Sequence, residues 1–179
     1  QEGIKKQVSE WCNQFHPNSH DLLVVYWTGH GSIDQSVFCL VTSDIGLREV
    51  NIALTLPALI RCMKTEDHHV LLIIDTCHSG AGTSDALKMG ARLREAAGGH
   101  ARENGLHIIS TTRSTELART KAFIDGLDQV IRSGRAGSSD EEFIRPDKLI
   151  ALVNDALTSA LDDENQQHAK LNLGSEGLF

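Results

Sequence analysis

Residues 70–80 read V-L-L-I-I-D-T-C-H-S-G, and this stretch joins an apolar run directly to polar and reactive side chains. The continuous apolar run 70–74 is typical of a central strand in a parallel sheet whose two faces are both covered. Open α/β sheets place their sites beyond the carboxyl ends of the strands. Cys77 therefore lies where a nucleophile is expected, although a small buried cysteine is a common structural element.

Further apolar runs predict an α/β fold with a mainly parallel central sheet, built as a single domain over residues 1–179. We expect core strands over 22–27, 70–74 and 106–110, and a hairpin off the main sheet formed by 37–41 with 47–50. Helical spacing of apolar residues predicts helices over 3–15, 56–63, 123–134 and 146–161. Residues 83–105 are polar, with a weakly helical middle over 85–97, and we interpret the segment as a whole as a loop.

Composition excludes several classes of function. The net charge of -7, the low aromatic content of 4% and the lack of a Lys/Arg run argue against nucleic-acid binding. No apolar run is long enough for a membrane span, and no signal peptide is visible. The four cysteines include no CxxC pair, which predicts reduced thiols in a cytoplasmic protein.

A second glycine-bounded turn follows the strand predicted at 22–27. It reads T-G-H-G-S over residues 28–32. If the two strands are neighbours, His30 and Cys77 face each other, and a catalytic cysteine needs such a base. Gly31 and Gly80 allow tight turns and close approach of a substrate. The backbone N–H groups of Gly31 and Cys77 are then candidates for an oxyanion hole.

The turns T-G-H-G-S and D-T-C-H-S-G, with His30 standing 47 positions before Cys77, resemble those of caspase-like cysteine peptidases. The similarity is to metacaspases and bacterial relatives more than to caspases proper, which carry Q-A-C-x-G at the cysteine. Segments 108–113 (I-I-S-T-T-R) and 121–127 (K-A-F-I-D-G-L) resemble the strand and helix that follow in that family. The resemblance covers nearly the whole chain and implies a caspase-like three-layer sandwich.

The resemblance implies a cysteine endopeptidase mechanism. His30 is the general base, Cys77 is the nucleophile that forms an acyl-enzyme, and the amides of Gly31 and Cys77 form the oxyanion hole. Asp75 matches the acid that binds a basic P1 side chain, and Thr28 matches a serine beside that pocket. The alternative for Asp75 is a carboxylate that only caps or forms its turn.

The resemblance also implies a setting. We expect a protein or peptide substrate, no nucleic acid or membrane contact, and a regulated effector domain within a larger protein or complex, with a role in cell death or bacterial defence. No cofactor is expected, although Asp44 and Asp85 loosely match the calcium-binding acids of some metacaspases. Because the family has a strand, a helix and a strand ahead of the first helix found here, we interpret the chain as N-terminally incomplete.

Residues 83–105 occupy the place of the caspase activation loop. Lys88, Arg92, Arg94 and Arg102 lie within it, so an enzyme specific for Arg or Lys is expected to cleave itself there.

Three alternative functions are also compatible with the sequence. The first is a catalytically inactive caspase-like scaffold. The second is a peptidase of the related branch attached to helical-repeat proteins, and the third is a metal-binding module. The last would use His30, Cys77 and His78, but no ligand-spacing pattern supports it.

Overall fold

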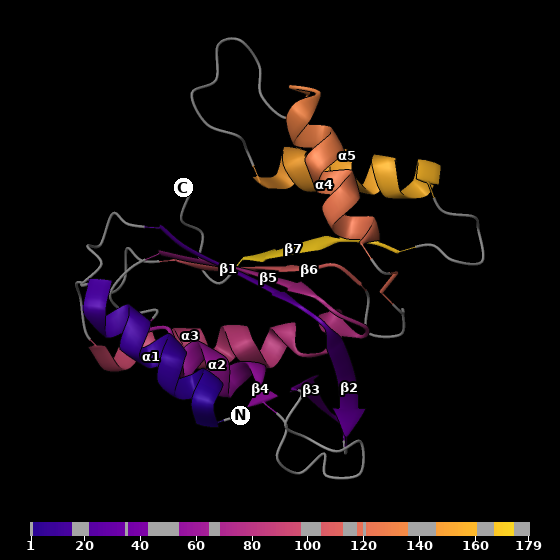
Figure 1. Ribbon diagram of the computed structural model, residues 1–179. Helices are drawn as coiled ribbons and strands as arrows, with labels where there is room; N and C mark the ends of the chain where they lie inside the picture. The colour runs from indigo at the N-terminus through magenta and orange to yellow at the C-terminus, as the bar shows by residue number, and fades with distance from the viewer. Residues whose placement is uncertain are drawn as a thin grey trace.

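The computed structural model describes residues 2–15, 22–34, 36–42, 54–64, 69–97, 105–112, 118–119, 121–135, 146–160 and 167–173. Their helices and strands form three layers, with a central sheet between two layers of helices (Figure 1). The elements in chain order are α1 (Glu2–Phe15), β1 (Leu22–Thr28), β2 (His30–Asp34), β3 (Val37–Val41), β4 (Leu54–Thr55), α2 (Leu56–Cys62), β5 (His69–Asp75), α3 (Thr83–Ala97), β6 (Leu106–Ser110), α4 (Ala122–Arg132), α5 (Pro146–Ala160) and β7 (Lys170–Leu173).

The central sheet has the strand order β1-β5-β6-β7. β1, β5 and β6 are parallel, and β7 is antiparallel to β6. This arrangement confirms the predicted α/β fold with a mainly parallel sheet flanked by helices. The three core strands expected from their apolar runs are present, whereas β7 was not predicted.

β7 escapes prediction because its local signal is weak. It has four residues, and Lys170 is exposed. The chain just before it is held by the side chain of Asn154 in α5, whose amide nitrogen donates to the carbonyl of Ala169 at 2.9 Å. The Asn154 side-chain oxygen accepts from the Ala169 N–H at 2.8 Å. Tertiary contact therefore sets the position of this strand.

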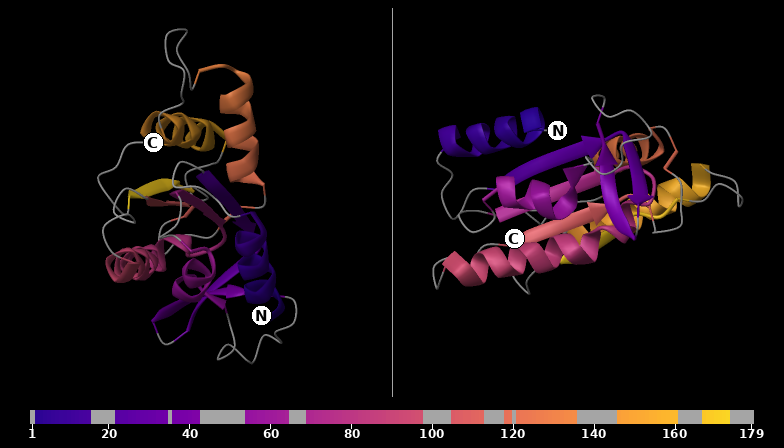
Figure 2. Two further views of the ribbon diagram at one scale, coloured as in Figure 1. Left: turned by 90° about the vertical axis from the view of Figure 1, so that its left-hand side faces the viewer. Right: turned by 90° about the horizontal axis from the view of Figure 1, so that it is seen from below.

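A second, smaller sheet has the order β2-β3-β4 and lies on the side of the central sheet that carries α1, α2 and α3 (Figures 1 and 2). The prediction that 37–41 forms a hairpin arm off the main sheet is confirmed. Its partner is β2, which begins at His30 inside the T-G-H-G-S motif. The expected other arm, 47–50, lies outside the described residues. Within the motif, Thr28 ends β1, Gly29 lies at a bend, and His30 begins β2.

The predicted helices are present as α1, α2, α4 and α5. The start of α2 illustrates the local cause, since the Thr55 hydroxyl accepts the Ala58 N–H at 3.3 Å and Pro57 stands in the first turn. Within the described part of the chain, no helix has the length and apolar character needed to cross a membrane.

The weakly helical middle expected over 85–97 is confirmed, whereas the interpretation of this part of 83–105 as belonging to a loop is wrong. Residues Thr83–Ala97 form the regular helix α3. Ala86 is fully buried, and Leu87, Met89 and Leu93 pack against the same core, which stabilises a helix whose polar sequence gives only a weak local signal. Lys88 and Arg92 are thus helical residues. Arg94 also lies in α3, and Arg102, the fourth expected cleavage position, lies outside the described residues.

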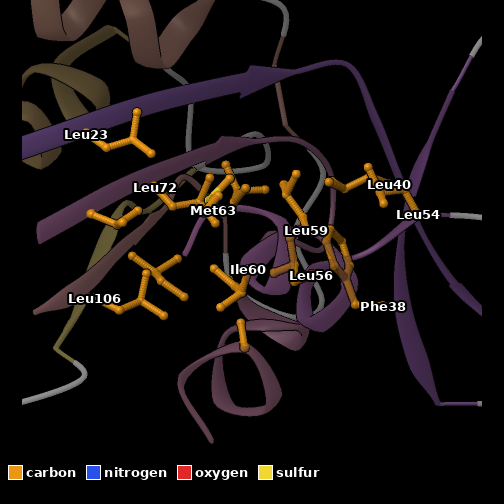
Figure 3. Packing of buried hydrophobic residues seen from close by; sticks show 14 of the residues in the cluster. Leu23, Phe38, Leu40, Leu54, Leu56, Leu59, Ile60, Met63, Leu72 and Leu106 are labelled. Atoms are coloured by element: carbon orange, nitrogen blue, oxygen red, sulfur yellow. The ribbon is translucent and has the colours of Figure 1, made fainter. Parts of the chain in front are cut away.

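The two faces of the sheet bury separate cores. One core lies between the sheet, α1, α2, α3 and the small sheet, and includes Leu23, Leu72 and Leu106 (Figure 3). The other lies beneath α4 and α5 and includes Ile73, Ile109 and Phe123. β1 is an edge strand among the described elements.

Leu72 and Leu22 offer a matched test of this packing. Leu72 in β5 is 0% exposed, whereas Leu22 in β1 is 47% exposed. Leu72→Ala should lower the free energy of unfolding by about 3 kcal/mol, because it removes buried methyl groups and leaves a cavity. Leu22→Ala should cost well under half of that. Urea denaturation of both variants provides the measurement, and equal losses would contradict the assigned core.

Candidate functional site

The two motif turns lie side by side because β1 and β5 are adjacent and parallel. Their paired residues run to Thr28 opposite Asp75, the last residue of each strand. Just beyond this pair, the Gly29 N–H donates to the Asp75 carbonyl at 3.3 Å. His30 follows Thr28 by two positions and Cys77 follows Asp75 by two, so both leave the sheet at the same edge. The condition set by the sequence, that the two strands be neighbours, is therefore met.

Gly31 brings the second motif directly against the cysteine turn. A Cβ atom placed on Gly31 would collide with the Cys77 backbone carbonyl and would lie 2.6 Å from the Thr76 hydroxyl. Any larger residue would push the two turns apart. The chain segments that carry the amides of Gly31 and Cys77 are thus in contact, which is the arrangement that an oxyanion hole made of both would need.

Cys77 lies in the turn after β5 and is partly exposed. Its sulfur accepts a hydrogen bond from the Ala118 N–H at 3.3 Å. This bond restrains the position of the Cys77 sulfur. No sequence pattern points to Ala118, which lies 41 positions away from Cys77. His78 follows in the left-handed backbone conformation with φ 59°.

The cysteine turn is attached to the end of β6 through Thr112. The Thr112 hydroxyl accepts the Ser79 N–H and donates to the Thr76 carbonyl, both at 3.0 Å. The Thr112 N–H donates to the Ser79 hydroxyl at 3.1 Å, and the Gly80 N–H donates to the Thr112 carbonyl at 3.0 Å. Since Ser79 and Thr112 are fully buried, these bonds fix the turn that carries Cys77.

Thr112→Val tests this attachment, because valine keeps the shape and removes the hydroxyl. The variant leaves the buried Ser79 N–H and Thr76 carbonyl without this partner, which should cost about 1–3 kcal/mol of unfolding free energy. Thr158→Val, at an exposed position of α5, is the matched control and should change stability little. Thermal denaturation compares the two, and equal stability would contradict the assigned role of Thr112.

Asp75 is the buried carboxylate at this edge of the sheet, with 6% exposure. One oxygen accepts the Tyr26 hydroxyl from β1 at 2.7 Å, and the other accepts the Thr111 hydroxyl at 2.9 Å. Both bonds run to segments on either side of β5, which differs from the local pattern of a carboxylate that only forms its own turn. Among the described residues, none of the ion pairs involves Asp75.

Tyr26 is coupled to this carboxylate electrostatically. Burial of its hydroxyl, and then the hydrogen bond and negative charge of Asp75, raise the pKa of Tyr26 well above its ordinary value of 10.0, while a hydrogen bond with the Thr28 side chain opposes the shift. Thr28 itself is exposed. Sequence reasoning selected Asp75 and Thr28 but missed Tyr26, which connects them.

The raised pKa of Tyr26 gives a pH dependence. Because the folded protein holds this proton more tightly than the unfolded chain, the stabilisation is complete below pH 10 and is lost as the pH rises from 10 toward the raised pKa. Tyr26 is the single tyrosine of the chain, so tyrosinate absorbance in the ultraviolet follows it alone. The substitution Asp75→Asn should lower the pH at which Tyr26 ionises. Identical titration of native and denatured protein would contradict the coupling.

The other predicted residues are placed as follows. His30 begins β2 and is exposed. Asp85 lies in the exposed first turn of α3, where its carboxylate pairs with Lys88 at 3.4 Å, and Asp44 lies outside the described residues. The described residues, which include His30, Cys77 and His78, contain no group of three His, Cys, Asp or Glu side chains able to hold a metal ion.

Comparison with known proteins gives a structural likeness alone. No protein-family model matches the chain, and no curated protein matches its sequence. Among solved structures, the chain is similar to protein GSU0716 from Geobacter sulfurreducens, with a TM-score of 0.61 and 13% sequence identity. The likeness covers 99% of this chain and 74% of that one. At this identity it supports the fold, a three-layer α/β sandwich.

Proposed function

We propose that this chain is a cysteine endopeptidase that cleaves peptide bonds after Arg or Lys, with Cys77 as nucleophile and His30 as general base. The observation that carries the proposal is the contact of the two turns, in which Gly31 lies against the Cys77 carbonyl. The Ala118 N–H bonded to the Cys77 sulfur restrains the position of the proposed nucleophile. The resemblance of both motifs to caspase-like peptidases supports the same roles.

The proposed reaction is acyl transfer in two steps. Cys77 attacks the scissile carbonyl carbon after its thiol proton passes to His30, and the oxyanion is held by the N–H groups of Gly31 and Cys77. The C–N bond breaks as His30 returns the proton to the leaving amine, which leaves a thioester on Cys77. Water then attacks the thioester carbon, and its proton passes through His30 to the departing sulfur.

The proposed preference for a basic P1 residue follows from Asp75. A buried carboxylate is costly unless hydrogen bonds and a cation compensate its charge. Tyr26 and Thr111 supply two hydrogen bonds, and the described ion pairs supply no cation. A guanidinium or ammonium group of the substrate would provide it, through charge-assisted bonds to the carboxylate. Thr28, on the same face of β1 as Tyr26, would line the approach.

A peptide assay tests the proposal. Short peptides with Arg, Lys or Asp at P1 are given to wild type, Cys77→Ala and the control Cys62→Ala, with and without calcium. We expect cleavage after Arg and Lys, its loss in Cys77→Ala and its retention in Cys62→Ala. Asp75→Asn should reduce kcat/KM for Arg peptides by about 10- to 100-fold, the cost of losing charge-assisted bonds.

Three results would contradict parts of the proposal. Cleavage only after Asp would overturn the role of Asp75. Equal loss of Arg-peptide cleavage and of Cys77 alkylation in Asp75→Asn would show that Asp75 only maintains the turn. No cleavage of any peptide would favour the catalytically inactive scaffold.

A further inference from the structure

The carboxylate of Asp75 is oriented by two hydroxyl groups from different parts of the sheet. Tyr26 comes from β1, 49 positions before Asp75, and Thr111 directly follows β6, 36 positions after it. Each oxygen receives one of the two bonds, at 2.7 Å and 2.9 Å. A carboxylate held at both oxygens has a fixed rotamer, which is a condition for precise recognition of a planar cation.

These two bonds leave acceptor capacity on the carboxylate. An ionised carboxylate has about four lone-pair sites, and the two hydroxyl groups occupy one on each oxygen. Both hydroxyl groups act as donors to Asp75. The remaining sites are suited to the N–H groups of a guanidinium or ammonium ion.

The exposure of the three residues indicates the side of approach. Thr111 is fully buried and Asp75 nearly so, whereas Tyr26 is 39% exposed. Tyr26 and Ile73 are register partners in β1 and β5, so Tyr26 lies on the sheet face that carries Ile73 and Asp75. Tyr26 is therefore the exposed member of the three, and the π face of an aromatic ring attracts positive charge.

We infer that Tyr26 is the positioning residue of a cation-binding pocket, in which it orients the Asp75 carboxylate, with Thr111 as the second donor, to receive the basic side chain of the substrate. This inference rests on the proposed function for the nature of the substrate, but the cation site itself does not require catalysis. It assigns to Tyr26 a role in specificity separate from the chemistry at Cys77.

The kinetic test uses Tyr26→Phe, which keeps the ring and removes the hydroxyl. For an Arg peptide, KM should rise about tenfold with kcat nearly unchanged, because a bond that orients the carboxylate is lost. Cleavage of the matching norleucine peptide and alkylation of Cys77 by iodoacetamide should not change. Equal losses for both peptides together with slower alkylation would show a merely structural role and overturn the inference.

A binding test separates this inference from the proposed function. In the Cys77→Ala background, agmatine, a guanidinium on an alkyl stem, is titrated by calorimetry. Tyr26→Phe should raise its Kd about tenfold, and Thr111→Val should raise it similarly. The control is Trp27→Phe, since Trp27 is the next residue of β1 and packs into the opposite core. This control should leave the Kd unchanged.

Bound agmatine should also lower the pH at which Tyr26 ionises, because the cation offsets the charge of Asp75. Absence of agmatine binding, or the same Kd with and without the Tyr26 hydroxyl, would overturn the inference. Agmatine binding that depends on Tyr26, in a protein that cleaves no peptide, would support the cation pocket and contradict the peptidase function.

Discussion

The parallel pairing of β1 with β5 is the constraint on which the rest of the site depends. Its register places Thr28 opposite Asp75, so the two glycine-bounded turns leave the sheet together. In a β-sheet, a slip of one residue turns every side chain to the other face. Such a slip would separate Tyr26 from Asp75 and move the buried Leu23 out of its core. The hydrophobic core and the candidate site are therefore fixed by the same pairing.

The contact between the turns also explains the glycine at position 31. Most of β2 is polar or glycine, which is a poor strand sequence by itself. It pairs with β3, whose Phe38 and Leu40 are buried in the main core. The small sheet thus holds the His30 segment against the cysteine turn. The Ser79–Thr112 bonds hold that turn from the other side.

The sequence was informative where the signal is local. Apolar runs predicted β1, β5 and β6, and helical spacing predicted α1, α4 and α5. The placement of the turns that carry His30 and Cys77 at one edge of the sheet could be inferred, because each turn follows its own strand end. In contrast, Tyr26, Thr111, Thr112 and Ala118 depend on the strand register and on contacts made 33 to 49 positions apart. Strand β7 was not predicted, and the helical character of α3 was underestimated, because tertiary packing supplies the stabilisation of both elements.

The proposed nucleophile Cys77 and the proposed pocket for basic side chains can be tested together. The most direct measurement is the rate at which peptidyl chloromethyl ketones label the protein, with the modified cysteine identified by mass spectrometry among the four in the chain. We expect a reagent with Arg at P1 to label Cys77 far faster than the same reagent with Asp at P1, and His30→Ala to slow this labelling. Equal rates for both reagents, or labelling of another cysteine in place of Cys77, would contradict this expectation.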